Sequence, residues 1–226
     1  MNGINDALWL LVLVTLIMLS ASSRLLRCIR NVAFQGLLVG IIPLALHGFS
    51  HIAPSHLALS AVNIILKGVL LPALMIWTVK RIGIKRELEP LLGYGQSIAV
   101  TLTFILLSFV LSARLPLPEG APTLALPAAF SAMLTGLFII MARRKAITQI
   151  IGFLTSENGI TLFAAALSVN CGILVELGVL LDVFVLIFIM AVLVFRISSE
   201  YKHIDADKLN KLDDADEPLN AGGNDK

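Results

Sequence analysis

Four ionisable residues interrupt long apolar runs of this 226-residue chain, and they mark where the sequence could carry out chemistry. They are Lys67, Glu157, Glu176 and Asp182, each inside a run long enough to cross a bilayer. A charged side chain facing lipid near the membrane centre costs about 2.5–3.5 kcal/mol, so four of them cannot all face lipid. We expect them to face protein or water, where carboxyl groups can form a proton relay and a lysine can pair with them.

The depth of these residues in the membrane strengthens this interpretation. Lys67, Glu157 and Asp182 fall near the centres of three different apolar runs and therefore share the bilayer midplane. Glu176 lies six residues before Asp182, which places it about 9 Å closer to the outer face. Carboxyl groups spaced for bridging waters are what proton hopping requires, although a set of interhelical hydrogen bonds would produce the same pattern.

The run that contains Lys67 has further polar features. Ser60, Asn63 and Lys67 recur at helical spacing and form one polar stripe, in which Asn63 is expected to support the relay. Pro72 has no backbone N–H, so the carbonyl of Gly68 loses its helical partner, which predicts a kink or a water pocket beside Lys67. The alternative is that Lys67 only pairs with a carboxylate and holds the bundle together.

Glu157 stands among polar neighbours that would spread around most of a helix. Thr155, Ser156, Glu157 and Asn158 follow one another, so no single face of a helix can bury all of them. This predicts either a helix surrounded by protein or a local distortion such as a π-bulge. Interhelical hydrogen bonds are expected for the neutral members, with Asn158 supporting the relay. Close helix contacts rather than hinges are expected at three glycines: Gly152, Gly159 and Gly178.

The composition excludes most soluble classes of protein. Hydrophobic residues make up 58% of the chain and charged residues 14%, whereas soluble domains carry about a quarter charged residues. Cys28 and Cys171 are expected at opposite membrane faces, too far apart for a disulfide and too few for a four-thiolate metal site. No catalytic, cofactor-binding or metal-binding residue is predicted, and the loop histidines His47, His51 and His56 are not interpreted as a metal site.

The apolar runs predict an all-α integral membrane protein with about seven transmembrane helices. The expected spans are 5–22, 32–49, 57–79, 96–113, 121–141, 147–168 and 173–195. Basic residues follow the odd-numbered spans, which places the N-terminus outside and the C-terminus in the cytoplasm. They are Arg24, Arg27, Arg30, Lys80, Arg81, Lys85, Arg86, Arg143, Arg144, Lys145 and Arg196. Residues 1–196 thus form the membrane domain, with a carboxylate-bearing helix pair at 147–196, and the acidic segment 197–226 is expected to be a disordered cytoplasmic tail.

The motifs around the buried carboxylates resemble those of the hydrogenase-4 component E (HyfE) family. They are Gln149-Ile150-x-Gly152, Glu157-Asn158-Gly159 and Val175-Glu176-x-Gly178 followed by Asp182, and Lys67 with Pro72 five residues later fits the same pattern. Proteins of this family are membrane subunits of formate hydrogenlyase and related nickel–iron hydrogenase complexes, which are related to respiratory complex I. Their last three spans are similar to the K subunit of complex I (NuoK) and to the C subunit of multisubunit cation/proton antiporters.

This resemblance implies roles for individual residues. The last two helices of the K subunit each carry a midplane glutamate, to which Glu157 and Asp182 correspond by depth, with an aspartate at the second position here. It also implies antiporter-like membrane partners and hydrogenase-like peripheral partners that hold the nickel–iron and iron–sulfur centres. A bacterial or archaeal plasma membrane is the implied location.

The predicted function is therefore that of a proton-relay or ion-translocating subunit in the membrane arm of an energy-converting oxidoreductase, with no catalytic centre of its own. Glu157, Asp182, Glu176 and Lys67 would carry the relay. Two alternatives remain open: a self-sufficient small transporter or channel, and a purely structural membrane anchor for partner subunits.

Overall fold

The computed structural model describes residues 2–47, 60–61, 64–82, 92–115, 122–143 and 145–167. The chain divides into two units, Met1–Phe184 and Val185–Lys226, and all of the described residues belong to the first. Their secondary structure is helical: α1 (Asn2–Ala21), α2 (Leu25–His47), the π-helix η1 (Ile64–Leu70), α4 (Leu71–Ile82), α5 (Tyr94–Ser112), α6 (Ala125–Ala142) and α7 (Ala146–Ala166).

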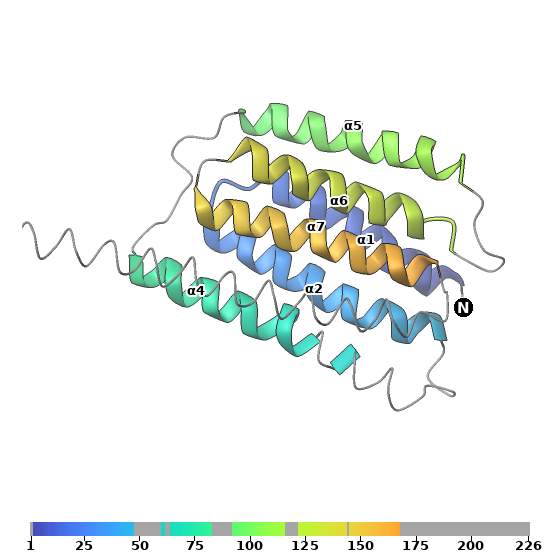
Figure 1. Cartoon of the computed structure of the whole chain (residues 1–226), viewed down its shortest axis with the longest axis horizontal. Coiled ribbons are helices and arrows are strands. Elements are labelled where there is room, and N and C mark those ends of the chain that lie inside the picture. Colours follow the sequence, from blue (N-terminus) through green and yellow to red (C-terminus); the bar gives the residue numbers. More distant parts are fainter. Residues whose placement is uncertain are drawn as a thin grey trace, which may run out of the picture. The chain divides into compact units, whose positions relative to one another are not determined.

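Helices α6 and α7 form the most extensive contact among the described elements. Helix α2 packs against α7 and also against η1 and α4, whereas α5 contacts α6 and α1. Figure 1 shows α5 and α4 at opposite edges of these helices, with α6, α7, α1 and α2 between them. Helix α7 therefore lies inside the bundle, which is where a helix with several polar residues must lie.

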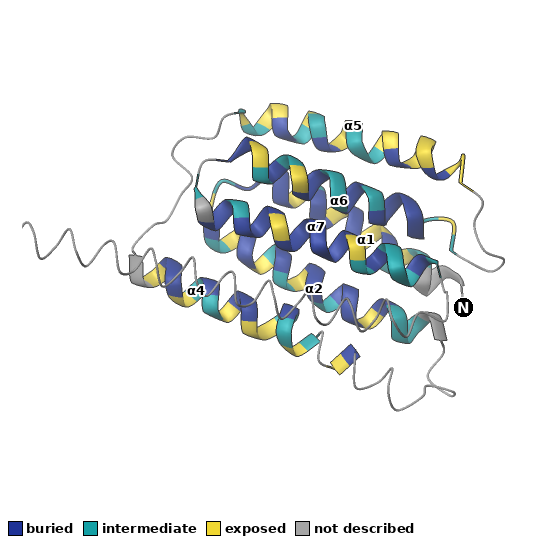
Figure 2. Cartoon of the chain, viewed as in Figure 1, coloured by how far each residue is buried: buried dark blue, intermediate teal, exposed yellow. Residues whose placement is uncertain are grey.

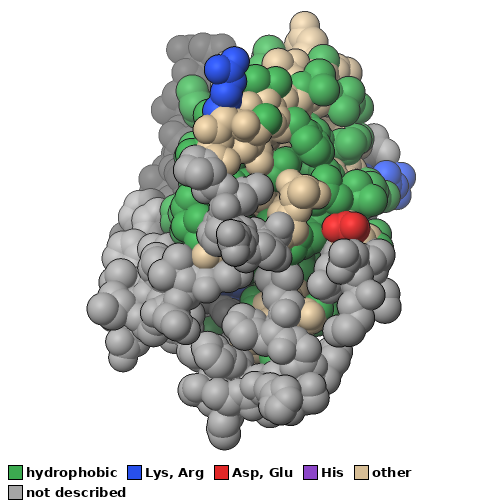
Figure 3. Space-filling model, turned by 90° about the vertical axis from the view of Figure 1, so that its right-hand side faces the viewer, with side chains coloured by type: hydrophobic (Ala, Val, Ile, Leu, Met, Phe, Trp, Pro, Cys, Tyr) green, Lys and Arg blue, Asp and Glu red, His purple; other side chains and the backbone are tan. Residues whose placement is uncertain are grey.

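The burial pattern is that of a bundle with an apolar outside. Trp9, Leu16 and Leu126 belong to a buried apolar core, yet large apolar side chains such as Leu106 (68% exposed) and Met141 (78%) are also on the surface. The outer helices α4 and α5 are exposed along one side in Figure 2, and Figure 3 shows a face where the described side chains are mainly hydrophobic. Among the described residues, α2, α5 and α6 are long and apolar enough to cross a membrane.

The expected spans correspond closely to the observed helices, with one clear exception. Helix α2 begins at Leu25, whereas the apolar run predicted a start at residue 32. Arg27 and Arg30 lie on its first turns, three residues apart, and both are exposed. A search for apolar runs misses these turns because Arg27 and Arg30 interrupt the run. Their side chains are exposed, so they do not interrupt the helix. The seventh expected span, 173–195, and the acidic tail, 197–226, lie outside the described residues.

The helix that contains Lys67 is distorted, whereas the helix that contains Glu157 is regular. Residues Ile64–Leu70, which include Lys67, wind as a π-helix, and Pro72 follows two residues later. Since Pro72 cannot donate a backbone hydrogen bond to the preceding turn, regular α-helical bonding is interrupted here. Around Glu157 two alternatives were expected, a helix surrounded by protein or a local distortion. The first is confirmed, because α7 is α-helical from Ala146 to Ala166 and all four consecutive polar residues are buried.

Candidate functional site

Glycines bring the backbone of α2 against the π-helix. A Cβ atom placed on Gly36 would lie 2.8 Å from the carbonyl oxygen of Lys67, and one on Gly40 would collide with the side chain of Ile64. Gly68 of η1 has the same relation to Leu37 of α2. Gly36 and Gly40 form a Gly-x-x-x-Gly motif, which allows close helix contact in membranes. Lys67 is therefore held beside α2 by backbone contact.

Helix α7 is held against α6 in the same way. A Cβ on Gly136 would overlap the backbone nitrogen of Ser156, and one on Gly152 would lie 2.8 Å from the carbonyl oxygen of Gly136. A Cβ on Gly159 would lie 2.6 Å from the backbone nitrogen of Met133. The predicted close helix contacts at Gly152 and Gly159 are confirmed, while Gly178 lies outside the described residues.

Lys67 and Glu157 form a buried ion pair between η1 and α7. Lys67 Nζ lies 3.2 Å from Glu157 Oε1, and the two side chains are 3% and 2% exposed. Lys67 Nζ also donates a hydrogen bond of 3.1 Å to Thr161 Oγ1, whose hydroxyl donates to the carbonyl of Glu157 at 3.1 Å. The lysine is thus bound to two residues one turn apart on the same helix.

A second buried polar contact joins α7 to α2. Asn158 Nδ2 donates a hydrogen bond of 3.3 Å to Gln35 Oε1, and both side chains are buried. Gln35 Nε2 is also buried and has no hydrogen-bond partner in the part of the chain that the structure describes. An amide nitrogen without a partner in an apolar interior is costly, and such groups are commonly satisfied by a water molecule or a further polar side chain.

Of the residues predicted for the relay, the structure brings together Lys67, Glu157 and Asn158. Glu176, Asp182 and Asn63 lie outside the described residues. Gln35 and Thr161 were not among the predicted site residues, although both carried a signal in the sequence. Gln35 is a single amide in an apolar run, and Thr161 stands one helical turn after Glu157.

The arrangement couples charge at one residue to charge at the other. In a poorly polarisable interior, a carboxylate and an ammonium group in contact stabilise each other, and each becomes unfavourable when the other is neutralised. Transfer of a proton to Glu157 would therefore release Lys67 from the pair. Within the described residues, no three His, Cys, Asp or Glu side chains are grouped closely enough to hold a metal ion.

The membrane-capable helices and the buried carboxylate–lysine pair define a helical membrane protein with ionisable side chains in its interior, and comparisons with known proteins place it more closely. Residues 124–214 match the family model for NADH-ubiquinone/plastoquinone oxidoreductase chain 4L. The chain is 33% identical over 188 residues to the uncharacterized protein Rv0085 of Mycobacterium tuberculosis, covering 82% of this chain and 85% of that protein.

It is also 28% identical over 211 residues to hydrogenase-4 component E of Escherichia coli K12, covering 92% of this chain and 96% of that protein. Hydrogenase-4 component E of Shigella flexneri matches to the same extent. No solved structure matches. The chain belongs to the hydrogenase-4 component E family, and its region around Glu157 is similar to chain 4L of complex I.

Proposed function

We propose that this chain is a proton-relay subunit in the membrane arm of an energy-converting oxidoreductase related to complex I, of the hydrogenase-4 or formate hydrogenlyase type. The observation that carries the proposal is the buried ion pair between Lys67 and Glu157. Glu157 lies inside the segment that matches chain 4L, and about half-way along a helix of 21 residues. An ionisable pair at that depth is costly to maintain for structure alone, since apolar residues of similar volume are often as stable.

The proposed relay uses Glu157 as the proton-accepting group and Lys67 as its charge partner. Protonation of Glu157 removes the ion pair with Lys67, and loss of the proton restores it. Moving one charge across the membrane costs about 2.3 kcal/mol per 100 mV, so redox energy from partner subunits has to change the charge state or the water access of such a group. Asp182 and Glu176 would continue the path, with Glu176 towards the outside, and Asn63 and Asn158 would support it.

The remaining features of the proposal concern the whole complex. The chain would cross a bacterial or archaeal plasma membrane seven times, with its N-terminus outside, a membrane domain at 1–196 and a cytoplasmic tail at 197–226. It would have no catalytic centre of its own. Nickel–iron and iron–sulfur centres would reside in hydrogenase-like peripheral subunits, and antiporter-like subunits would be its neighbours in the membrane.

The test is a Glu157→Gln variant in the purified, intact complex reconstituted into sealed vesicles. We expect coupled proton movement to be lost or strongly reduced while the complex still assembles, because glutamine keeps the shape of the side chain but cannot exchange a proton. Thr155→Val is the matched control, since among the described residues the Thr155 hydroxyl bonds only to the carbonyl of Ile151 in its own helix. Unchanged turnover and unchanged proton movement in Glu157→Gln would contradict the relay.

Two measurements separate the alternatives. A purely structural anchor predicts that Glu157→Gln reduces the recovery of copurifying subunits but leaves the coupling of the assembled fraction intact. A self-sufficient transporter predicts ion movement in vesicles that contain this chain alone.

A further inference from the structure

Thr161 gives the ammonium group of Lys67 a neutral acceptor beside the carboxylate of Glu157. Lys67 Nζ lies 3.2 Å from Glu157 Oε1 and donates a hydrogen bond of 3.1 Å to Thr161 Oγ1. The Thr161 hydroxyl donates in turn to the backbone carbonyl of Glu157 at 3.1 Å. The lysine is therefore bound to the side chain of Glu157 and, through Thr161, to the backbone of the same residue.

The direction of these hydrogen bonds determines what the hydroxyl can do. A hydroxyl has one proton to donate and lone pairs with which to accept, whereas an ammonium group only donates. Because the proton of Thr161 is used on the carbonyl of Glu157, its oxygen presents lone pairs to Lys67. Donation to the carbonyl also polarises the hydroxyl, which makes its oxygen a better acceptor. This contact with Lys67 does not require a charge on Glu157.

The ion pair, in contrast, exists only while Glu157 is ionised. Lys67 is buried, and its backbone is held against Gly36, so an ammonium group that loses its carboxylate has little access to water. A buried charge without an acceptor is costly. A neutral acceptor that stays in place lowers this cost and keeps the ammonium group beside Glu157 until the carboxylate is restored.

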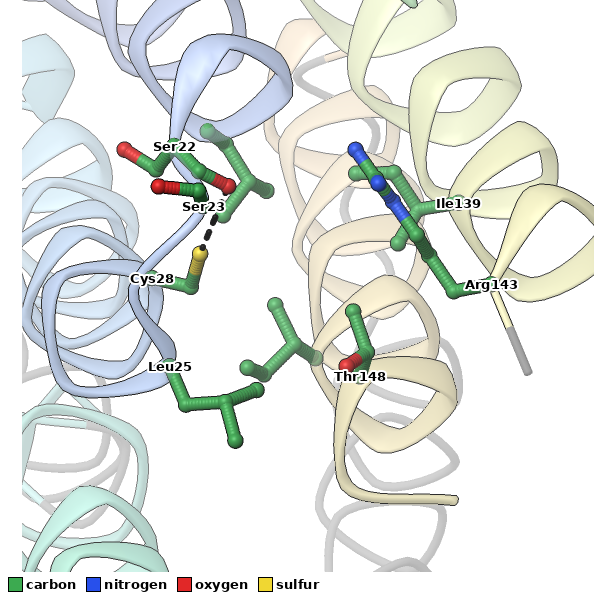
Figure 4. A pocket seen from close by; sticks show the side chains of 9 residues that line it. Ser22, Ser23, Leu25, Cys28, Ile139, Arg143 and Thr148 are labelled. Carbon is green, nitrogen blue, oxygen red and sulfur yellow. Dashed lines mark hydrogen bonds between the residues drawn. The ribbon is translucent and has the colours of Figure 1, made fainter. Parts of the chain in front are cut away.

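The three threonines of α7 have different surroundings. Thr148 lines a small pocket beside Arg143 at the beginning of the helix, as Figure 4 shows. Thr155 donates to the carbonyl of Ile151 at 2.8 Å and lies about 200° around the helix from Glu157, on its opposite side. Thr161 makes the same kind of bond to the carbonyl four residues earlier, but it also contacts the ion pair. Thr155 is therefore a matched control for Thr161.

We propose that Thr161 is a positioning residue of the relay, which holds the ammonium group of Lys67 beside Glu157 in both protonation states of the carboxyl group. Thr161 acts through Lys67 and neither gains nor loses a proton itself. Its part in a relay rests on the proposed function, whereas its hold on Lys67 does not.

The first test is reversible unfolding of the full-length chain in mixed detergent micelles, in the unmodified and Glu157→Gln backgrounds. Glutamine imitates the shape of a neutral carboxyl group. We expect Thr161→Val to raise the unfolding equilibrium constant about tenfold in both backgrounds, as for loss of a hydrogen bond to a charged group. Thr155→Val should change it less than about threefold, because a hydroxyl bonded to its own helix contributes little. Equal effects of the two valine variants in Glu157→Gln would overturn the proposal, since the lysine would then leave Thr161 when Glu157 is neutral.

Two further variants separate a hold on Lys67 from simple packing. In a Lys67→Met background there is no ammonium group to hold, so Thr161→Val and Thr155→Val should have equal effects. A larger effect of Thr161→Val there would assign the residue a packing role and contradict the proposal. If Lys67→Met does not fold, Thr161→Ser decides the question, because serine keeps the hydroxyl and should retain most of the stability. Equal losses in Thr161→Ser and Thr161→Val would contradict the proposal as well.

The second test measures the protons moved per turnover by the intact complex in sealed vesicles. We expect a partial loss in Thr161→Val, recovery in Thr161→Ser and no change in Thr155→Val. Normal proton movement in Thr161→Val, combined with its loss in Glu157→Gln, would overturn the positioning role and leave the relay intact. Normal proton movement in both variants would contradict the relay itself and, with it, the part of Thr161 in it.

Discussion

Removing the lysine from the buried ion pair should destabilise the protein far more than an ordinary surface substitution. Lys67→Met keeps most of the side-chain volume but leaves the carboxylate of Glu157 in a site that is 2% exposed. Water cannot replace the missing ammonium group there without opening the contacts between η1, α2 and α7. Breaking a buried pair from one side typically costs about 3–5 kcal/mol, and we expect a loss of unfolding free energy in this range.

The separation of the charges supports that magnitude. At 3.2 Å, unit charges attract by about 5 kcal/mol when the effective dielectric constant is about 20. Much of this attraction offsets the cost of removing both charges from water, so removing both together should be mild. We therefore expect the unfolding free energy of the double variant Lys67→Met/Glu157→Met to lie within about 1 kcal/mol of that of the unmodified chain, although each single variant is strongly destabilised.

The assay is reversible unfolding in mixed micelles of a mild detergent and dodecyl sulfate, followed by circular dichroism. Lys80→Met is the control, because Lys80 is exposed near the end of α4 and its replacement should change the free energy by no more than about 0.5 kcal/mol. A double variant as unstable as Lys67→Met would refute this expectation. In that case the energetic coupling between Lys67 and Glu157 would be small and the ion pair would not hold the helices together.

Two further variants test the contacts that position the pair. Gly136→Ala should lower the unfolding free energy by about 1–3 kcal/mol, because its Cβ would overlap α7. Gly95→Ala is the control: nothing lies within 4 Å of a Cβ at this position, so the unfolding free energy should stay unchanged or rise. Equal effects of the two variants in thermal unfolding would contradict the packing. Asn158→Leu should lower the unfolding free energy by about 1–3 kcal/mol, because Gln35 Oε1 loses the donor Asn158 Nδ2. Adding Gln35→Leu should recover part of that loss. Additive losses in the same assay would argue against the amide contact.

The helices, and the need of Lys67 for a buried carboxylate partner, could be predicted because each follows from a large energetic term. Apolar runs of membrane length locate helices, since the bilayer penalises polar groups by several kcal/mol. The same penalty requires Lys67 and Glu157 to find partners, but Asp182 is expected at the same depth, so the sequence did not decide which carboxylate Lys67 meets. The burial of Asn158 follows similarly. Four consecutive polar residues point to most sides of a helix, so the helix must be surrounded by protein for all of them to avoid lipid.

Other parts of the site depend on terms that a single sequence does not expose. Gln35 is one amide in an apolar helix, and whether it meets Asn158 depends on the rotation of α2 about its axis. The π-helix around Lys67 reflects a balance between the missing donor of Pro72 and the close contact at Gly36, which is a tertiary effect. Both outcomes require knowledge of which helices are neighbours.

The glycine contacts on both sides of the ion pair have a consequence for how this site can persist through divergence. Lys67 is held through its backbone against Gly36, and the helix of Glu157 is held through its backbone against Gly136. The position of each charged residue relative to the helix beside it is thus determined by main-chain contact rather than by the shapes of the surrounding leucines, isoleucines and valines. Those apolar side chains can be exchanged for one another with small local cost, while the few glycines and charged residues keep the geometry. Relatives at 28–33% identity can therefore retain the same charge pair although many of the apolar residues around it differ.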